Sequence, residues 1–358
     1  MKRIFLTCCF YLLFIASSFA DDGHARLGES VVDGQVIPSL EALFKSMQNL
    51  APASAKFCKS QTEENRRLVN STFHSVMDAW QVAQIFSFGP LIRKGRFSRV
   101  YFWPGRAGST ERYLRKVFIS RPSDLTNSKK IGDRSVAVHS LAAFERFMFD
   151  PARRAVLQNV DPYKCKVAVA ISAFQVELLR EVLREWYGKD GFRRAILEPE
   201  HNNPLYRNHR DVANDILGLL SSNLERIARL KLRRPIGKSF EKKRPNRLEN
   251  WRSGRTKKNI QLNLTTLRRL YSEKNGLESL LRSYYAIALA DEVRAKFKNA
   301  ERILADIPEP LHETIRIKKN WRSLEKFYNE IESLGRMTSG PVAQTLGLVV
   351  GFNSLDGD

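Results

Sequence analysis

The sequence has few cysteines, no His-Glu-x-x-His segment and almost no pattern typical of β-strands. Only four of its 358 residues are cysteine, and two of these, Cys8 and Cys9, lie close to the N-terminus. The lack of a His-Glu-x-x-His pair excludes the usual helical zinc-protease motif. Alternating β-branched runs bounded by turn residues are nearly missing, which excludes a mainly β fold. There is no local signature of serine–histidine–acid or cysteine–histidine catalysis.

The N-terminal 20 residues have the pattern of a secretory signal peptide. Lys2 and Arg3 precede an apolar stretch that runs from Ile4 to Phe19, and small residues follow up to Ala20. This order is typical of a signal peptide that is cleaved near Ala20. The apolar stretch is short for a membrane-spanning helix and ends in a cleavage pattern. We therefore expect an exported chain that is not membrane-spanning.

Processing at this site would leave Cys58 and Cys165 as the two cysteines of the mature chain. Exported compartments are oxidising, so the pair favours one disulfide, with a reactive thiol as the alternative. Two cysteines so far apart in sequence cannot form a zinc site without other ligands.

Negative charge is scarce relative to positive charge. Lys and Arg number 60 against 38 Asp and Glu, which gives a formal charge of +22. Such an excess is typical of nucleic-acid-binding proteins, but export argues against a nucleic-acid partner. The basic residues are densest over residues 229–258. This segment is either a solvated loop or a patch that faces an anionic surface polymer, lipid head groups or an acidic partner.

Helical periodicity covers most of the chain. Apolar residues recur at three- and four-residue spacing over 68–86, 165–187, 211–232, 264–289, 290–304 and 311–334. Long amphipathic helices bury their apolar faces against one another, so the expected fold is all-α and bundled. The polar segment 198–209 predicts a junction between an N-terminal helical bundle, residues 21–205, and a C-terminal one, residues 206–358.

One stretch, SVAVHSLAAFERFMFD (135–150), places a histidine and a glutamate close together in an expected helix. His139 and Glu145 are six residues apart, so on a regular helix they point about 120° apart and cannot chelate one ion. The position three residues before Glu145 would share its face, but it holds Ala142. We interpret His139 as a packed or exposed histidine.

The same stretch resembles the helix that carries the Gly-x-His-x-x-Glu motif of the imelysin-like family, also called the M75 peptidase family. In this alignment Ser140 takes the glycine position, Ala142 the histidine position and Glu145 the glutamate position, so only the glutamate is retained. Other segments match a divergent, periplasmic branch of the family in the same order along the chain: DAWQVAQIFSFGP (78–90), YFWPGR (101–106), DVANDILGLLSSNLERI (211–227), ENWRSGRTKKNI (249–260) and GFNSLDGD (351–358).

The resemblance implies two packed helical bundles, a functional cleft near the motif helix and a periplasmic location. For some members it also implies a link to iron uptake, and peptidase activity is the family's historical label. Because Ala142 replaces the motif histidine, metal-dependent peptidase chemistry loses its best ligand. We therefore predict no cofactor. Iron or zinc binding stays possible, but the degenerate motif does not support it.

Two glycine-containing turns carry candidate binding residues. One turn holds Trp103 and Arg106. Either Trp103 packs in the corner between two helices while Arg106 caps backbone carbonyls, or Arg106 lies beside Glu145 and binds an anionic group. The other turn holds Trp251, Arg252 and Ser253 in a loop, where binding residues often occur.

Asp215 lies on an expected helix face together with Asp211. It is either a surface acid or a partner of Arg252.

The predicted function is that of a non-catalytic protein of the cell envelope that binds a small ligand or an envelope protein. The alternatives are a metal-dependent peptidase of the M75 type and a cationic protein that binds an anionic surface polymer through residues 229–258. The expected ligand-binding residues are Trp103, Arg106, Ser140, Glu145, Asp215, Trp251, Arg252 and Ser253.

Overall fold

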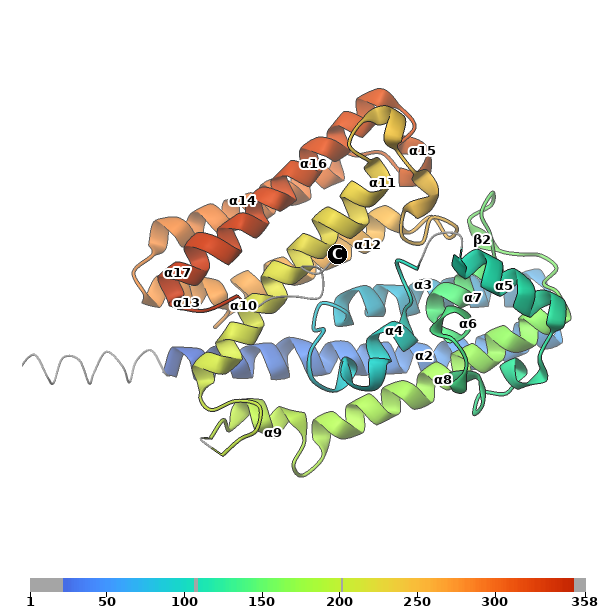
Figure 1. The fold of residues 1–358 in the computed structure, drawn as a ribbon, viewed down its shortest axis with the longest axis horizontal. Coiled ribbons are helices and arrows are strands. Elements are labelled where there is room, and N and C mark those ends of the chain that lie inside the picture. Colours follow the sequence, from blue (N-terminus) through green and yellow to red (C-terminus); the bar gives the residue numbers. More distant parts are fainter. Residues whose placement is uncertain (1–21, 106–108, 201, 351–358) are drawn as a thin grey trace, which may run out of the picture.

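The computed structural model describes residues 22–105, 109–200 and 202–350. Residues 1–20, Arg106 and residues 351–358, on which some of the expectations above depend, lie outside these ranges. The fold is all-α and consists of two packed helical bundles, as predicted (Figure 1). The α-helices are α2 (Ile37–Lys59), α3 (Glu63–Ala83), α4 (Arg96–Val100), α5 (Ser109–Ser120), α6 (Val136–His139), α7 (Leu141–Met148), α8 (Pro162–Tyr187), α9 (Phe192–Leu197), α10 (His209–Arg226), α11 (Arg234–Ile236), α12 (Thr256–Ser272), α13 (Leu277–Ser283), α14 (Ile287–Ala305), α15 (Leu311–Thr314), α16 (Lys318–Met337) and α17 (Ala343–Leu346).

Short helical segments of other types join or extend these helices. The π-helical segments are η1 (Val32–Val36), η6 (Ile227–Arg233) and η9 (Thr338–Val342). The 3₁₀ turns are η2 (Gly89–Leu91), η3 (Arg93–Gly95), η4 (Ser123–Thr126), η5 (Ile131–Asp133), η7 (Phe240–Lys242) and η8 (Pro245–Arg247). Strands β1 (Phe149–Asp150) and β2 (Ala155–Val156) form a small antiparallel hairpin after α7.

The first bundle is built on α2, which packs against α3 and α8 along its length (Figure 1). Leu40, Leu43, Met47 and Leu50 recur at three- and four-residue spacing and are buried on one face of α2. The start of α8 is fixed by Asp161, whose carboxylate accepts hydrogen bonds from the backbone N–H groups of the first turn. The local sequence thus sets both the helix ends and the buried faces.

The second bundle contains α10, α12, α14 and α16, which pack pairwise. Helix α10 continues through the π-helical segment η6 into α11, so one long helical rod runs along this bundle (Figure 1). The chain passes from the first bundle to the second between α9 and α10, within the segment predicted as a junction. No helix of the described residues is long and apolar enough to cross a membrane.

A buried group of polar side chains joins the two bundles where α3 meets η6 and α12. We call Gln81, Lys231, Glu249, Asn259 and Asn263 the interbundle polar cluster. The Lys231 ammonium donates to Gln81 Oε1 and to Glu249 Oε2, both at 2.9 Å, and to Asn263 Oδ1. The Lys231 and Glu249 side chains are each only 1% exposed. Burial lowers the pKa of Lys231, and the charge of Glu249 opposes that shift.

The predicted disulfide between Cys58 and Cys165 is confirmed. The bond joins the last turn of α2 to the first turn of α8, with the two Cα atoms 5.5 Å apart. It therefore links two helices that already pack together in the first bundle.

Candidate functional site

The motif stretch is not one helix, which corrects the sequence-based expectation. Helix α6 ends at His139, and Ser140 adopts an extended conformation with φ −87° and ψ 164°. The Ser140 carbonyl then accepts hydrogen bonds from the N–H groups of Ala143 and Phe144, which makes Ser140 the N-cap of α7. The Ser140 side chain makes no capping hydrogen bond, so the break is defined by the backbone conformation of a residue that the sequence analysis treated as helical.

His139 is a packed core residue and contacts no part of Glu145. Its side chain is buried, its Nδ1 lies 3.2 Å from the carbonyl oxygen of Ile131, and its ring meets Phe174 edge-on at 5.0 Å. Burial and the nearby charge of Arg99 lower the pKa of His139 to about 4.

This pKa predicts a measurable acid sensitivity. The unfolded chain protonates His139 near pH 6.5 and the folded chain only near pH 4, so stability is complete above pH 6.5 and falls as the pH drops toward 4. At pH 5 the loss amounts to about 2 kcal/mol. We expect His139→Leu to remove this loss in urea titrations at pH 7 and pH 5. The similar loss due to His74, whose pKa is also about 4, would remain. An unchanged pH dependence in His139→Leu would contradict the assignment.

Glu145 connects the motif helix to the second bundle. Its Oε1 atom accepts one hydrogen bond from the Ser253 backbone N–H at 2.9 Å and another from the Ser253 hydroxyl at 2.7 Å. Both residues are buried. The loop that carries Ser253 turns at Gly254, where φ is +73° and a Cβ atom would lie 2.8 Å from Arg154 Cδ. Glycine at this position therefore allows the loop to approach the first bundle.

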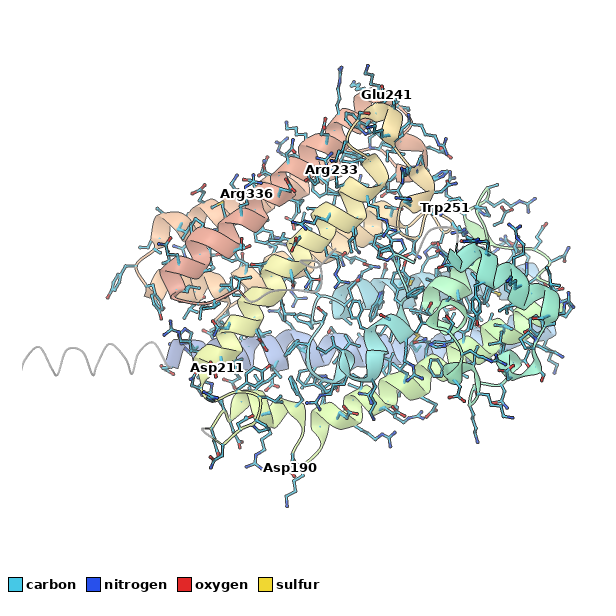
Figure 2. All side chains as sticks on the ribbon, in the orientation of Figure 1. Asp190, Asp211, Arg233, Glu241, Trp251 and Arg336 are labelled. Atoms are coloured by element: carbon cyan, nitrogen blue, oxygen red, sulfur yellow. A yellow bond between two sulfur atoms is a disulfide. The ribbon has the colours of Figure 1, made fainter. Side chains whose placement is uncertain are left out.

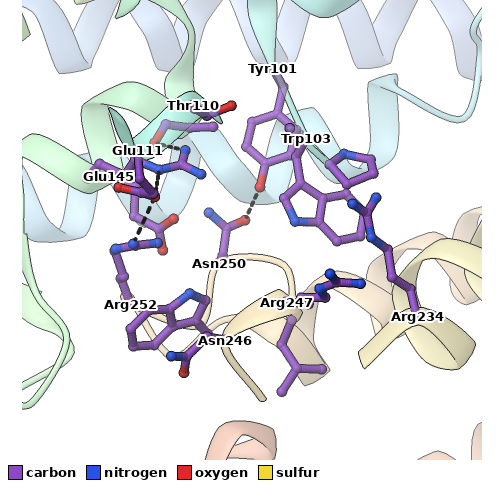
Figure 3. Close-up of a pocket in the computed structure, with 16 residues that line it drawn as sticks. Tyr101, Trp103, Thr110, Glu111, Glu145, Arg234, Asn246, Arg247, Asn250 and Arg252 are labelled. Carbon is purple, nitrogen blue, oxygen red and sulfur yellow. Dashed lines mark hydrogen bonds and ion pairs between the residues drawn. The ribbon is translucent and has the colours of Figure 1, made fainter. Parts of the chain in front are cut away.

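A cavity of about 320 Å³ lies between the bundles beside Glu145 (Figure 3). The first bundle lines it with the turn after α4 and with residues of α5 and α7. The second bundle lines it with α11 and with the segment before α12. The lining residues are Tyr101, Trp103, Pro104, Gly105, Thr110, Glu111, Ala142, Glu145, Arg146, Arg234, Asn246, Arg247, Leu248, Asn250, Trp251 and Arg252.

Glu111, which the sequence analysis missed, organises part of the charge in this cavity. Its Oε1 atom accepts from Arg146 Nε at 2.9 Å and from Arg252 Nη2 at 3.3 Å. Although burial acts in the opposite direction, these hydrogen bonds and charges lower the pKa of Glu111. Burial, together with the charge of Arg146, lowers the pKa of Arg252. The Arg252 guanidinium lies 4.5 Å from the ring centre of Trp251, a cation–π distance.

The structure brings several of the predicted site residues together. Four of them line the cavity: Trp103, Glu145, Trp251 and Arg252. Ser253 donates a hydrogen bond from its hydroxyl to Glu145. Ser140 is buried at the start of α7, does not line the cavity and serves as a helix cap. Arg106 lies outside the described residues. The role of these side chains in binding stays a prediction.

Asp215 lies elsewhere: of its two predicted roles, the pair with Arg252 is wrong, and the surface acid agrees with its exposed position. The carboxylate of Asp215 accepts a hydrogen bond from the Tyr206 hydroxyl at 2.7 Å, whereas Arg252 pairs with Glu111. Burial raises the pKa of Asp215. The spacing of residues along a helix gave no information about which distant acid would reach Arg252.

The basic segment 229–258 is only partly a solvated surface. Arg229 pairs with Glu225, Lys231 belongs to the interbundle polar cluster, and Arg233 stacks over Tyr328 at 3.7 Å (Figure 2). Further along, Arg255 donates to Asp78. The interpretation as a simple solvated loop is therefore wrong for Lys231, Arg233 and Arg255 but fits the exposed Arg229, and binding of an anionic polymer by this segment stays a prediction.

Comparison with known proteins establishes the family. The family model of imelysin, peptidase M75, matches residues 36–336 of this chain. The chain belongs to the imelysin family. Iron-regulated protein A of Synechococcus elongatus is 21% identical to this imelysin-family chain over 290 residues, which cover 79% of the chain and 76% of that protein.

Two solved structures share the imelysin fold. An imelysin-like protein from Psychrobacter arcticum 273-4 superposes with a TM-score of 0.76 at 16% identity, over 93% of this chain and 98% of its own. A protein described as an iron-regulated protein A precursor from Parabacteroides distasonis ATCC 8503 gives a TM-score of 0.71 at 12% identity, over 89% and 94% of the two chains. At these identities the likeness concerns the fold.

The family label raises the question of a metal, and the donors present in this imelysin-family chain do not fit one. Ala142 stands at the motif position for histidine, and one oxygen of Glu145 is already engaged twice by Ser253. Within residues 22–105, 109–200 and 202–350, no group of three or more His, Cys, Asp or Glu side chains could hold an ion. The described side chains therefore do not fit a metal ion at this site.

Proposed function

We propose that this imelysin-family protein is a non-catalytic ligand-binding protein of the cell envelope with a role in iron acquisition. The observation that carries the proposal is the cavity between the bundles, together with the way in which Glu145 is used there. Cavities of this size that are lined by aromatic and polar side chains are typical of small-molecule sites.

Glu145 positions part of the cavity wall. Its Oε1 atom accepts two hydrogen bonds from Ser253, which positions the loop with Trp251 and Arg252 at the cavity. A metal ligand needs partners of the same kind around it, and Ala142 stands where the family motif has histidine. This supports a structural role for the acid that remains from the family motif.

The envelope location and the link to iron rest on other observations. The N-terminal signal-peptide pattern and the Cys58–Cys165 bond both favour an oxidising, exported compartment. The link to iron comes from relatives that are named as iron-regulated proteins.

Substitution of Glu145 tests this proposal against its rival, an M75 metallopeptidase. We expect Glu145→Ala to lower the free energy of unfolding by about 1–3 kcal/mol, since it leaves two buried donors of Ser253 without an acceptor. Glu145→Gln keeps an acceptor oxygen, so it should lower the free energy of unfolding by less than Glu145→Ala. Chemical denaturation would measure both variants.

The same preparations should be assayed for bound metal and for peptide cleavage. We expect no stoichiometric zinc and no cleavage above background in the wild type. Stoichiometric zinc, with cleavage that is lost in Glu145→Ala, would overturn the proposal in favour of the peptidase.

A further inference from the structure

The charges that line the cavity do not balance. Four arginines face it against two glutamates. Arg146 and Arg252 share Glu111, and Glu145 is engaged by Ser253. Two cations, Arg234 and Arg247, are left over.

Among the residues that the structure describes, neither Arg234 nor Arg247 has a carboxylate partner. Both are half-buried, and the charged neighbours of Arg247 are the arginines Arg234 and Arg244. Half-buried guanidinium groups that repel one another lack the counter-charge that usually accompanies them. An anion at this wall of the cavity would supply that charge.

A second, independent observation comes from Asn250, whose side chain is buried and lines the same cavity. Its Oδ1 atom accepts from the Tyr101 hydroxyl at 3.0 Å and from Asn259 Nδ2 at 2.8 Å. These two donors fix the orientation of the amide, with its oxygen toward the Tyr101 hydroxyl and its Nδ2 group on the other side (Figure 3). This N–H₂ group has no partner within the described part of the chain. Buried donors normally have an acceptor, and here a ligand would provide it.

Trp103 and Trp251 add apolar surface to the cavity. The Trp251 ring is held between His312, stacked at 4.8 Å, and the Arg252 guanidinium at 4.5 Å, so its position is fixed before any ligand enters. In Figure 3, Trp103 lies beside Arg234 on the other side of the cavity. A ligand that fills the space therefore has a carbon body as well as charged oxygens.

We propose that the cavity binds a small organic molecule with two or more oxyanion groups, of carboxylate or phosphate chemistry. One oxyanion lies at Arg234 and Arg247, another acceptor takes the Asn250 N–H₂ group, and the carbon body lies against the two tryptophans. This inference rests on the proposed ligand-binding function and names the chemical class of the ligand.

Isothermal titration calorimetry with citrate and with inorganic phosphate tests the inference. Citrate carries three carboxylates on a carbon body, so we expect it to bind, and to bind more weakly as the salt concentration rises. If the natural ligand is a phosphorylated compound, inorganic phosphate will bind at this site in place of citrate. Glycerol, which is uncharged, should give no heat of binding.

Three variants locate the anion. Arg234→Gln and Arg247→Gln should each weaken binding by about ten- to a hundredfold, because each removes a charged hydrogen-bond donor. Asn250→Asp keeps the acceptor for Tyr101 and Asn259 but replaces the N–H₂ group by a charged oxygen, so it should weaken binding at least as much. Near-UV circular dichroism would verify that each variant is folded.

Arg207→Gln is the matched control. Arg207 is exposed in the connection before α10, and its guanidinium has no ion pair among the described residues. Its backbone N–H donates to Asp211, which lies far from Trp251 in Figure 2. We expect this variant to bind like the wild type.

Failure of this inference is distinguishable from failure of the proposed function. If neither citrate nor phosphate binds, or if folded Arg234→Gln and Arg247→Gln bind like the wild type, the oxyanion assignment is overturned. The binding function itself is overturned only if the wild type holds stoichiometric zinc and cleaves peptides, with cleavage lost in Glu145→Ala.

Discussion

Lys231→Met is expected to lower the free energy of unfolding by about 3–5 kcal/mol, the effect of removing one partner from a buried ion pair. The variant would leave the Glu249 carboxylate buried without its ammonium partner and the Asn263 oxygen without its donor, whereas the Gln81 oxygen would keep Gln84 and Asn263 as donors. Methionine has a similar length and fills the same space, so the loss would reflect charge and hydrogen bonding rather than a void. Urea unfolding followed by tryptophan fluorescence measures it.

Two further variants separate this effect from the loss of a lysine in general. Lys238→Met changes an exposed lysine that has no ion pair among the described residues, and it should shift stability by less than about 0.5 kcal/mol. The double variant Lys231→Met/Glu249→Gln removes both charges and should regain part of the loss, since the buried carboxylate no longer lacks its ammonium partner, although Arg226 loses the nearby charge of Glu249. If Lys231→Met were as stable as Lys238→Met, the cluster would not hold the bundles together.

Removal of the disulfide should lower the free energy of unfolding by an amount similar to that expected for Lys231→Met. The bond closes a loop with a sequence separation of 107 residues, and the chain-entropy model gives about 4–5 kcal/mol for a loop of that length. We expect Cys58→Ala/Cys165→Ala to lose that much stability in urea unfolding under non-reducing conditions.

The reductant provides the control for this prediction. Dithiothreitol should destabilise the wild type to the level of the double variant and should leave the double variant unchanged. Equal stability of the wild type with and without reductant, after confirmation that the bond is reduced, would contradict the prediction.

Local patterns were sufficient to predict the fold class. Helical periodicity depends on neighbours three and four residues away, so the faces of α3 and α8 follow from sequence alone. The break at Ser140 was missed because its flanking residues continue the apolar pattern, while the cap depends on one backbone conformation.

The candidate site was only partly predictable. The resemblance to a family pointed to Glu145 and to the loop with Trp251 and Ser253, but no local pattern pointed to Glu111, which lies 141 positions from its partner Arg252. Lys231 is part of a basic run that is typical of a surface. It is buried because its side chain reaches Gln81 on α3 and Asn263 on α12, and no local pattern encodes such long-range contacts.

The cavity has one wall on each bundle, with Trp103 and Glu145 on the first and Arg234 and Arg247 on the second. Its width is therefore a property of neither half but of the angle at which the two halves meet. A rotation of one bundle against the other would widen or narrow the gap between these walls, and a molecule that grips both walls resists that rotation. Occupancy of the cavity and mechanical stiffness of the whole protein are thus coupled.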